Sequence, residues 1–216
     1  MNGVKKIFDL NGPFLTFMGN LLWVIITNLV FIVAVIPVVT IGAATKSMYK
    51  VMYKIVGNRK VNFFETFFFS FFDKFATTFK LTLASLAVGA VCVIDLLYFW
   101  SMGNAVGYAM FGVCVLIAAV FLAFCLCAYP ILALRDGTFK ETIKDTWAFM
   151  NEYTGSAIAI FLVTAAFIGV TIAILLVQYL FMFQYLLFMT FGLNALIITY
   201  IVYAKLVLPD MVEEEE

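Results

Sequence analysis

Five long apolar segments constrain the fold of this chain more than any other feature. They cover residues 14–39, 81–100, 105–134, 157–177 and 183–208. A helix needs about 20 apolar residues to cross the hydrocarbon core of a bilayer, and each segment has that length. Hydrophobic residues make up 65% of the 216-residue chain, above the roughly 45–50% of soluble domains. We predict an all-α polytopic membrane helix bundle of about five transmembrane helices, forming a single domain over residues 1–216.

The first apolar segment also has features of a signal peptide. Lys5 and Lys6 would form its basic region, and Gly42, Ala43 and Ala44 would offer a weak cleavage site. The apolar stretch is longer than the roughly 7–15 residues usual for such peptides. We therefore predict a retained helix.

The basic residues indicate the orientation of these spans. Eleven of the 13 would lie on one side of the membrane, with only Lys5 and Lys6 on the other, while the short links at 101–104 and 178–183 carry no charge. Basic residues favour the cytoplasmic side. The pattern predicts an outside N-terminus, a cytoplasmic C-terminus and two cytoplasmic loops. A cytoplasmic N-terminus would require a re-entrant first segment or a different number of spans.

Three amphipathic helices are predicted in the cytoplasmic loops, over residues 44–56, 62–78 and 138–150. Asn62 with Glu65 and Thr138 with Glu141 have the spacing of a capping box. In the second helix one arc carries most of the rings, which we expect to lie in the inner leaflet or under the bundle: Phe64, Phe67, Phe68, Phe71, Phe72 and Phe75. The span–helix–span order occurs twice, through either an internal duplication or the chance likeness of amphipathic helices.

Lysines recur every fourth residue in the first loop helix, at Lys46, Lys50 and Lys54. The ordinary interpretation is a stripe that reaches lipid headgroups, since lysine stems lie along apolar surface while their ammonium groups stay in water. A ligand site is the alternative.

A hinge is predicted just before this helix. Pro37 cannot donate a backbone hydrogen bond, Thr40 or Thr45 could cap a new helix, and Gly42 permits a sharp turn or close packing. The simple interpretation is a helix break at the inner interface. The functional alternative is free backbone groups facing a polar cavity.

Polar residues within the spans are few. Asn28 and Asn194 are candidates for interhelical hydrogen bonds or, alternatively, for a solute pathway. Asp95 lies toward the outer end of its segment, so we expect it to face the bundle or the outer water. The four cysteines fall in apolar stretches and are expected to be small buried hydrophobic residues, with no metal or cofactor bound.

The chain resembles the YesL-like (DUF624) family of bacterial integral membrane proteins. The resemblance rests on PVVTIGAATKSMY (Pro37 to Tyr49), on the Phe-rich segment, and on AYPILALRDGTFKETIKDTW (Ala128 to Trp147), with Ala43 where relatives often have proline. Such proteins are typically encoded beside carbohydrate uptake systems in Gram-positive bacteria. The resemblance therefore implies a bacterial plasma membrane protein linked to carbohydrate uptake, with ABC-type sugar transporter subunits as partners besides the bilayer, and it implies no catalytic residues.

The residues themselves argue against an enzyme. The chain has no histidine, no paired intramembrane carboxylates and no phosphate-binding glycine loop. We expect a non-enzymatic accessory or interaction subunit that does not bind nucleic acid, with a small-solute transporter or facilitator as the alternative. The expected docking residues lie on the loop helices predicted over 62–78 and 138–150: Glu65, Phe68, Asp73, Glu141, Lys144 and Trp147.

Overall fold

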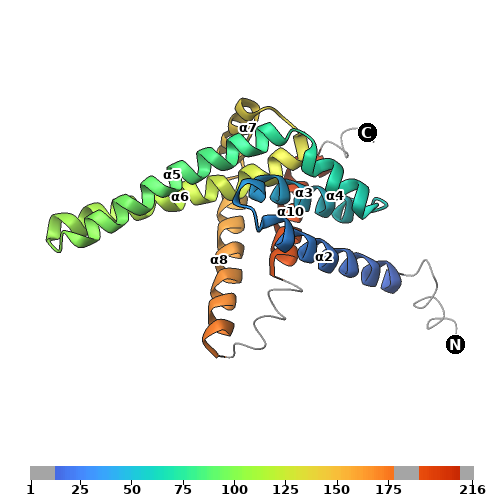
Figure 1. Cartoon of the computed structure of the whole chain (residues 1–216), viewed down its shortest axis with the longest axis horizontal. Helices are drawn as coiled ribbons and strands as arrows, with labels where there is room; N and C mark the ends of the chain where they lie inside the picture. The colour runs from blue at the N-terminus through green and yellow to red at the C-terminus, as the bar shows by residue number, and fades with distance from the viewer. Residues whose placement is uncertain (1–12, 178–189, 210–216) are drawn as a thin grey trace.

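The computed structural model describes residues 13–177 and 190–209, and the regular structure in those ranges is helical (Figure 1). The elements are α2 (Pro13–Val35), η1 (Val38–Thr40), α3 (Ile41–Val56), α4 (Phe63–Phe72), α5 (Phe75–Ser101), α6 (Ala105–Arg135), α7 (Phe139–Glu152), α8 (Thr154–Val177) and α10 (Thr190–Leu206). This confirms the predicted all-α membrane fold class.

Helix α3 lies at the centre of the molecule. Helices α2, α4, α5, α6 and α10 all pack against it, and its side chains Lys46, Val51 and Met52 are fully buried. We use the term central body for α3, α4 and α7 together with the ends of the long helices that pack around them. The prediction that the α3 lysines form a stripe on the lipid headgroups is wrong for Lys46, because that side chain is enclosed by the protein.

The long helices extend from the central body as separate arms. Figure 1 shows α5 and α6 side by side as one long hairpin, with α2 and α8 leaving in other directions. Among the described residues, four helices are long and apolar enough to cross a membrane, namely α2, α5, α6 and α8. Only 6–22% of the residues in their apolar windows are buried. Apolar surface on this scale requires a lipid environment.

Several element boundaries differ from the predicted ones. The first span was expected to reach residue 39, but α2 ends at Val35 because Pro37 interrupts the helix with an extended ψ of 121°. Helix α5 begins at Phe75 rather than 81, and α8 at Thr154 rather than 157. Helix α10 has 17 residues from Thr190, and residues 183–189 of the predicted fifth span lie outside the described residues.

Pro130 lies inside α6, within the apolar segment predicted over 105–134. The helix continues to Arg135, and the Tyr53 hydroxyl donates a 3.0 Å hydrogen bond to the Pro130 carbonyl oxygen from α3. Tertiary packing therefore supports the helix at the residue that would otherwise weaken it. The turn into the loop comes at Asp136, six residues later.

The predicted helix over 62–78 is two helices. The break falls at Asp73 and Lys74, where Lys74 has a left-handed φ of 49°. The predicted Asn62–Glu65 capping box is also wrong, since Asn62 Nδ2 donates to the Glu65 carboxylate instead of capping the backbone. The Thr138–Glu141 capping box at the start of α7 is confirmed.

Both loop helices turn their hydroxyl-bearing residues inward and many of their rings outward. Thr66 and Ser70 of α4 are buried against the central body, whereas Phe64, Phe69 and Phe72 are more than 70% exposed. In α7 the buried residues include Thr142 and Thr146, whose hydroxyls donate to the carbonyls four residues earlier. These side chains are small, so both helices pack closely against the central body, and the exposed rings are left to face lipid or a partner.

Candidate functional site

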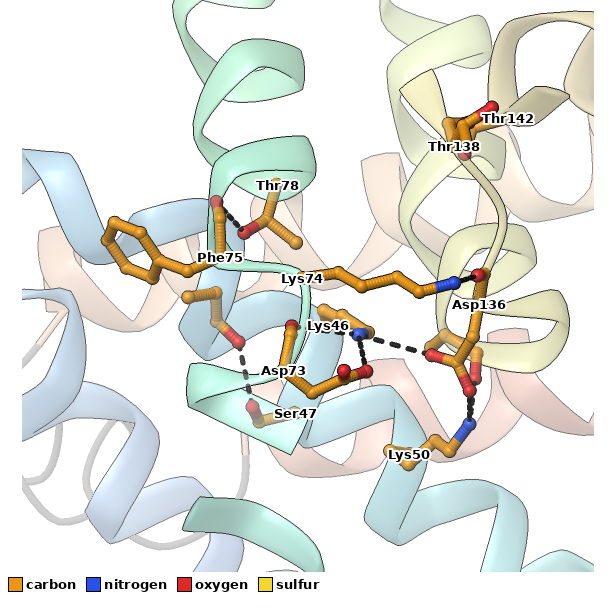
Figure 2. Close-up of polar contacts among 12 residues, drawn as sticks. Lys46, Ser47, Lys50, Asp73, Lys74, Phe75, Thr78, Asp136, Thr138 and Thr142 are labelled. Atoms are coloured by element: carbon orange, nitrogen blue, oxygen red, sulfur yellow. Dashed lines mark hydrogen bonds and ion pairs between the residues drawn. The ribbon is translucent and has the colours of Figure 1, made fainter. Parts of the chain in front are cut away.

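The most highly connected polar site joins α3 to both loop turns (Figure 2). Lys46 has a side chain with no exposed surface, and its ammonium group lies 3.0 Å from Asp73 Oδ2 and 3.1 Å from Asp136 Oδ1. It also donates to the Asp73 backbone oxygen at 3.1 Å. One lysine of α3 thus contacts two aspartates that are 63 residues apart in the sequence.

Lys50 holds the second loop from the next turn of α3. Its ammonium group donates to the Asp136 carboxylate and, at 2.9 Å, to the Ala133 carbonyl oxygen at the end of α6. Lys74 donates to the backbone carbonyl oxygen of Asp136. The turn between α4 and α5 is therefore bound directly to the turn between α6 and α7 (Figure 2).

The two turns share an uncommon backbone conformation. Lys74 has a φ of 49° and Asp136 a φ of 48°, in the left-handed region that residues other than glycine rarely occupy. Such a conformation costs on the order of 1–3 kcal/mol and persists where surrounding contacts determine it. Here the contacts are the ammonium groups of Lys46, Lys50 and Lys74, which engage the carboxylates and carbonyls that the turns expose.

Charge is nearly balanced within the site. Lys46 and Lys50 face Asp73 and Asp136, and Lys74 adds a third ammonium group, so three positive and two negative groups lie in one partly buried site. Partial burial raises the pKa of Asp136, but hydrogen bonds and charge from Lys50 and Lys46 outweigh this effect and hold that pKa below its ordinary value. Asp136 is therefore ionised at neutral pH. Its Oδ1 has the Lys46 ion pair but no well-directed hydrogen bond.

Two cavities flank this site, and both are lined by Lys50 and Lys54. One of 210 Å³ lies on the α4 side and includes Glu65, Asp73 and Asp136 in its lining. The other, of 180 Å³, lies on the α10 side and includes Arg59 and Tyr203. Within the described residues no group of histidine, cysteine or acidic side chains has the arrangement of a metal site.

A known protein family matches the part of the chain that supplies most of this site. The family model described as "Protein of unknown function, DUF624" matches residues 16–96. We call residues 16–96, which this family model matches, the DUF624 segment. The resemblance to the YesL-like family is thereby confirmed over this range. No match was found among curated proteins or among solved structures.

The DUF624 segment contains α3, α4 and most of α5, and so supplies every residue of the ion network except Asp136. The predicted hinge lies in the same segment. Pro37 precedes η1, and the Thr40 hydroxyl donates to the carbonyl oxygens of Ala34 and Pro37 at 2.6 and 2.7 Å. Thr40 occupies the N-cap position of α3, as predicted, but its side chain makes no capping hydrogen bond, and Thr45 donates to Ile41 within the helix.

Gly42 is required by close packing. A Cβ added there would come within 2.0 Å of Thr82 Oγ1 and 2.9 Å of the Thr78 backbone oxygen. The start of α3 thus lies directly against α5. This contact fits the packing interpretation of the hinge rather than an open polar cavity.

The intramembrane polar residues have three different environments. Asn28 is buried and its Oδ1 accepts a 2.9 Å hydrogen bond from the Gly192 backbone, which is the interhelical bond predicted for it. Asn194 Oδ1 is buried without a hydrogen-bond partner among the described residues. Asp95 is exposed on the α5–α6 arm.

The predicted docking residues separate into two groups. Glu65, Phe68, Lys144 and Trp147 are exposed on α4 and α7, with Trp147 lining an apolar groove against α6. Asp73 belongs to the ion network instead.

Glu141 is exposed but is part of the α7 capping box. The Thr138 backbone donates to its carboxylate and, with the Thr138 side chain, lowers the pKa of Glu141. Asp73 and Glu141 therefore have structural contacts of their own.

The sequence alone does not predict the network. Arg135-Asp136-Gly137 is a turn signal, and Lys74 is one of several basic residues in the first loop. The sequence signal for the network is the lysine spacing in α3. The opposite face of this helix is apolar, and if both faces are buried the lysines need carboxylate partners. No local pattern pairs Lys46 with a residue 90 positions later.

Proposed function

We propose that the protein is a non-enzymatic accessory subunit of a bacterial solute-uptake system, with the central body on the cytoplasmic face of the plasma membrane. This proposal rests on the ion network, which joins both loops into one unit with an exposed surface. A unit that orders two loops around a central helix is suited to holding a partner in a fixed geometry. The family resemblance supports carbohydrate as the solute and an ABC-type transporter as the partner.

The distribution of charge supports the orientation. Thirteen basic residues less Lys5 and Lys6 leave eleven, and these belong to α3, to the loops, or to the ends of α5, α6 and α10 near the central body. The far tip of the α5–α6 arm, residues 101–104, has no charged residue. By the positive-inside rule the central body and the C-terminus are cytoplasmic, and the N-terminus is outside.

The docking surface of this proposal consists of the exposed polar residues Glu65 on α4 and Lys144 on α7, beside the exposed rings Phe68 and Trp147. Helices α4 and α7 are on different sides of α3 and α5 in Figure 1, joined through their turns. Lipid could cover the rings. A protein partner would lose affinity when either charge is reversed, whereas anionic headgroups would bind the Glu65→Lys variant more strongly and the Lys144→Glu variant more weakly.

The experiment is co-purification of membrane partners with Glu65→Lys, Lys144→Glu and the double variant from native membranes. We expect loss of transporter subunits that wild type retains. Glu152→Lys reverses an exposed charge at the other end of α7 and is the matched control. Unchanged partner recovery by the double variant, with normal monodispersity in detergent, would contradict the docking surface.

A cavity of 350 Å³ favours the second candidate function, a small-solute transporter. It lies between α2, α3, α6, α8 and α10, and its mainly apolar wall includes Thr164 and Asn194. Both residues have a buried side-chain oxygen without a hydrogen-bond partner among the described residues. Purified protein in liposomes that moves a sugar without other subunits would establish this function in place of the accessory one.

A further inference from the structure

The C-terminal end of α3 brings two cations together. The Arg59 N–H donates to the Lys54 carbonyl oxygen at 2.9 Å and the Asn58 N–H to the Ile55 carbonyl oxygen at 3.2 Å. Asn58 has a left-handed φ of 51°. This is a Schellman motif, which usually pairs two apolar side chains at these positions. Here these positions hold Lys54 and Arg59, so the chain reversal brings a second basic residue back to the end of α3.

Within the described ranges neither cation forms an ion pair, although Lys54 also lines the neighbouring cavity together with Glu65, Asp73 and Asp136. Lys54 donates only to the neutral Thr66 hydroxyl, at 2.7 Å, and Arg59 is exposed without an ion pair. Other basic residues nearby are compensated, since Lys50 pairs with Asp136 and Arg135 with Asp145. Two like charges that line one cavity without an ion pair repel each other, and an anion bound between them would relieve this repulsion.

The pair borders the 180 Å³ cavity. Its lining consists of Lys50, Tyr53, Lys54, Arg59, Ala133, Leu134, Tyr203 and Val207. No carboxylate is among these residues, in contrast to the neighbouring cavity with its three acidic side chains. The cavity lies where the C-terminal ends of α3, α6 and α10 meet, and its walls are aromatic and aliphatic.

We propose that this cleft binds a phosphate monoester, with Arg59 and Lys54 as its charged ligands. A monoester carries about −1.5 to −2 charges at pH 7, which matches two uncompensated cations better than a carboxylate does. The planar guanidinium of Arg59 suits bidentate contact with phosphate oxygens. The apolar walls accept the group to which the phosphate is esterified. The site is independent of the docking surface proposed above.

The monoester could come from a soluble metabolite or from a lipid headgroup, and two arms of one experiment distinguish them. Full-length protein in neutral detergent is titrated calorimetrically with glycerol 3-phosphate. The same titration is repeated in phosphatidylcholine nanodiscs with and without phosphatidic acid. Competition by phosphatidic acid identifies a headgroup site, and its absence identifies a soluble ligand. Either result supports the phosphate monoester site once binding is measured.

Two variants test the residues. Arg59→Gln should weaken binding at least about tenfold, because it removes a charge-assisted contact. Lys60→Gln removes the same charge from the next residue, which is exposed and does not line the cavity, and should change affinity less than about twofold. Equal losses in both variants would reduce the effect to general electrostatics and overturn the proposal.

Absence of binding in both arms would also overturn the proposal. The alternative occupant of the cleft is the acidic stretch Glu213 to Glu216, which follows Val207 closely in the sequence. Binding that occurs only after all four are changed to glutamine would assign the cleft to the C-terminal residues and contradict a phosphate ligand for the native chain.

Discussion

Replacing Asp136 by asparagine removes the negative charge shared by Lys46 and Lys50 and should destabilise the protein strongly. Asparagine keeps the shape of the side chain and tolerates the left-handed backbone at this position, so the variant isolates the charge. The fully buried Lys46 would keep only Asp73 as a counterion.

The expected magnitude follows from the burial of the partners. Breaking a fully buried ion pair costs about 3–5 kcal/mol. The Asp136 side chain is 33% exposed, so screening by water lowers this value to about 2–3 kcal/mol. The assay is denaturation in mixed micelles, followed by far-UV circular dichroism.

The matched control is Asp145→Asn. Asp145 pairs with Arg135 at 3.2 Å, but the Arg135 side chain is 50% exposed, and a surface pair of this kind contributes about 0–1 kcal/mol. If the two variants lose the same free energy of unfolding, the network does not hold the loops together and the reasoning is wrong.

Three further predictions concern pH and packing. The folded-state pKa of Asp136 is lowered, so its contribution to stability is complete above the unfolded pKa of about 4 and is lost as pH falls through the folded pKa. The difference in unfolding free energy between wild type and Asp136→Asn should therefore shrink below about pH 4, and a constant difference would contradict this. Gly42→Ala should lower the free energy of unfolding by about 1–3 kcal/mol in the same assay, because its Cβ would meet Thr82 and Thr78. Gly19→Ala, with open space around it, should not destabilise the protein, and equal effects would refute the close approach of α3 and α5. Asn28→Ala should lower thermal stability by about 1–2 kcal/mol through the lost hydrogen bond to Gly192, and an unchanged melting temperature would show that the bond contributes nothing.

Elements whose signals are local could be predicted from the sequence. The apolar segments gave the long helices, because hydropathy over 20 residues is a property of the segment itself. The Thr138–Glu141 capping box is equally local, and the structure contains it. The hydrogen bond of Asn28 could be predicted because a buried side-chain amide in an apolar helix usually bonds to a neighbouring helix.

Elements determined by distant partners could not be predicted in the same way. The 62–78 segment is continuous in helical pattern, yet it breaks at Asp73, where Lys46 of α3 binds the backbone oxygen and the carboxylate of Asp73. The faces of α4 were assigned by assuming that rings are buried and polar residues exposed, whereas Lys54 draws Thr66 inward. The burial of Lys46 depends on Asp136, and that pairing has no signature in either segment alone.

The central claim is that one cytoplasmic body holds both loops while the apolar arms cross the membrane. Accessibility of single cysteines in intact cells tests it most directly, in a background where the four native cysteines are replaced. Exposed positions on the central body are Lys60 and Lys144, and Ser101 is exposed at the tip of the α5–α6 arm. The account predicts that a membrane-impermeant thiol reagent labels Ser101→Cys in intact cells and labels Lys60→Cys and Lys144→Cys only after permeabilisation. Labelling of Lys60→Cys and Ser101→Cys from the same side would contradict it.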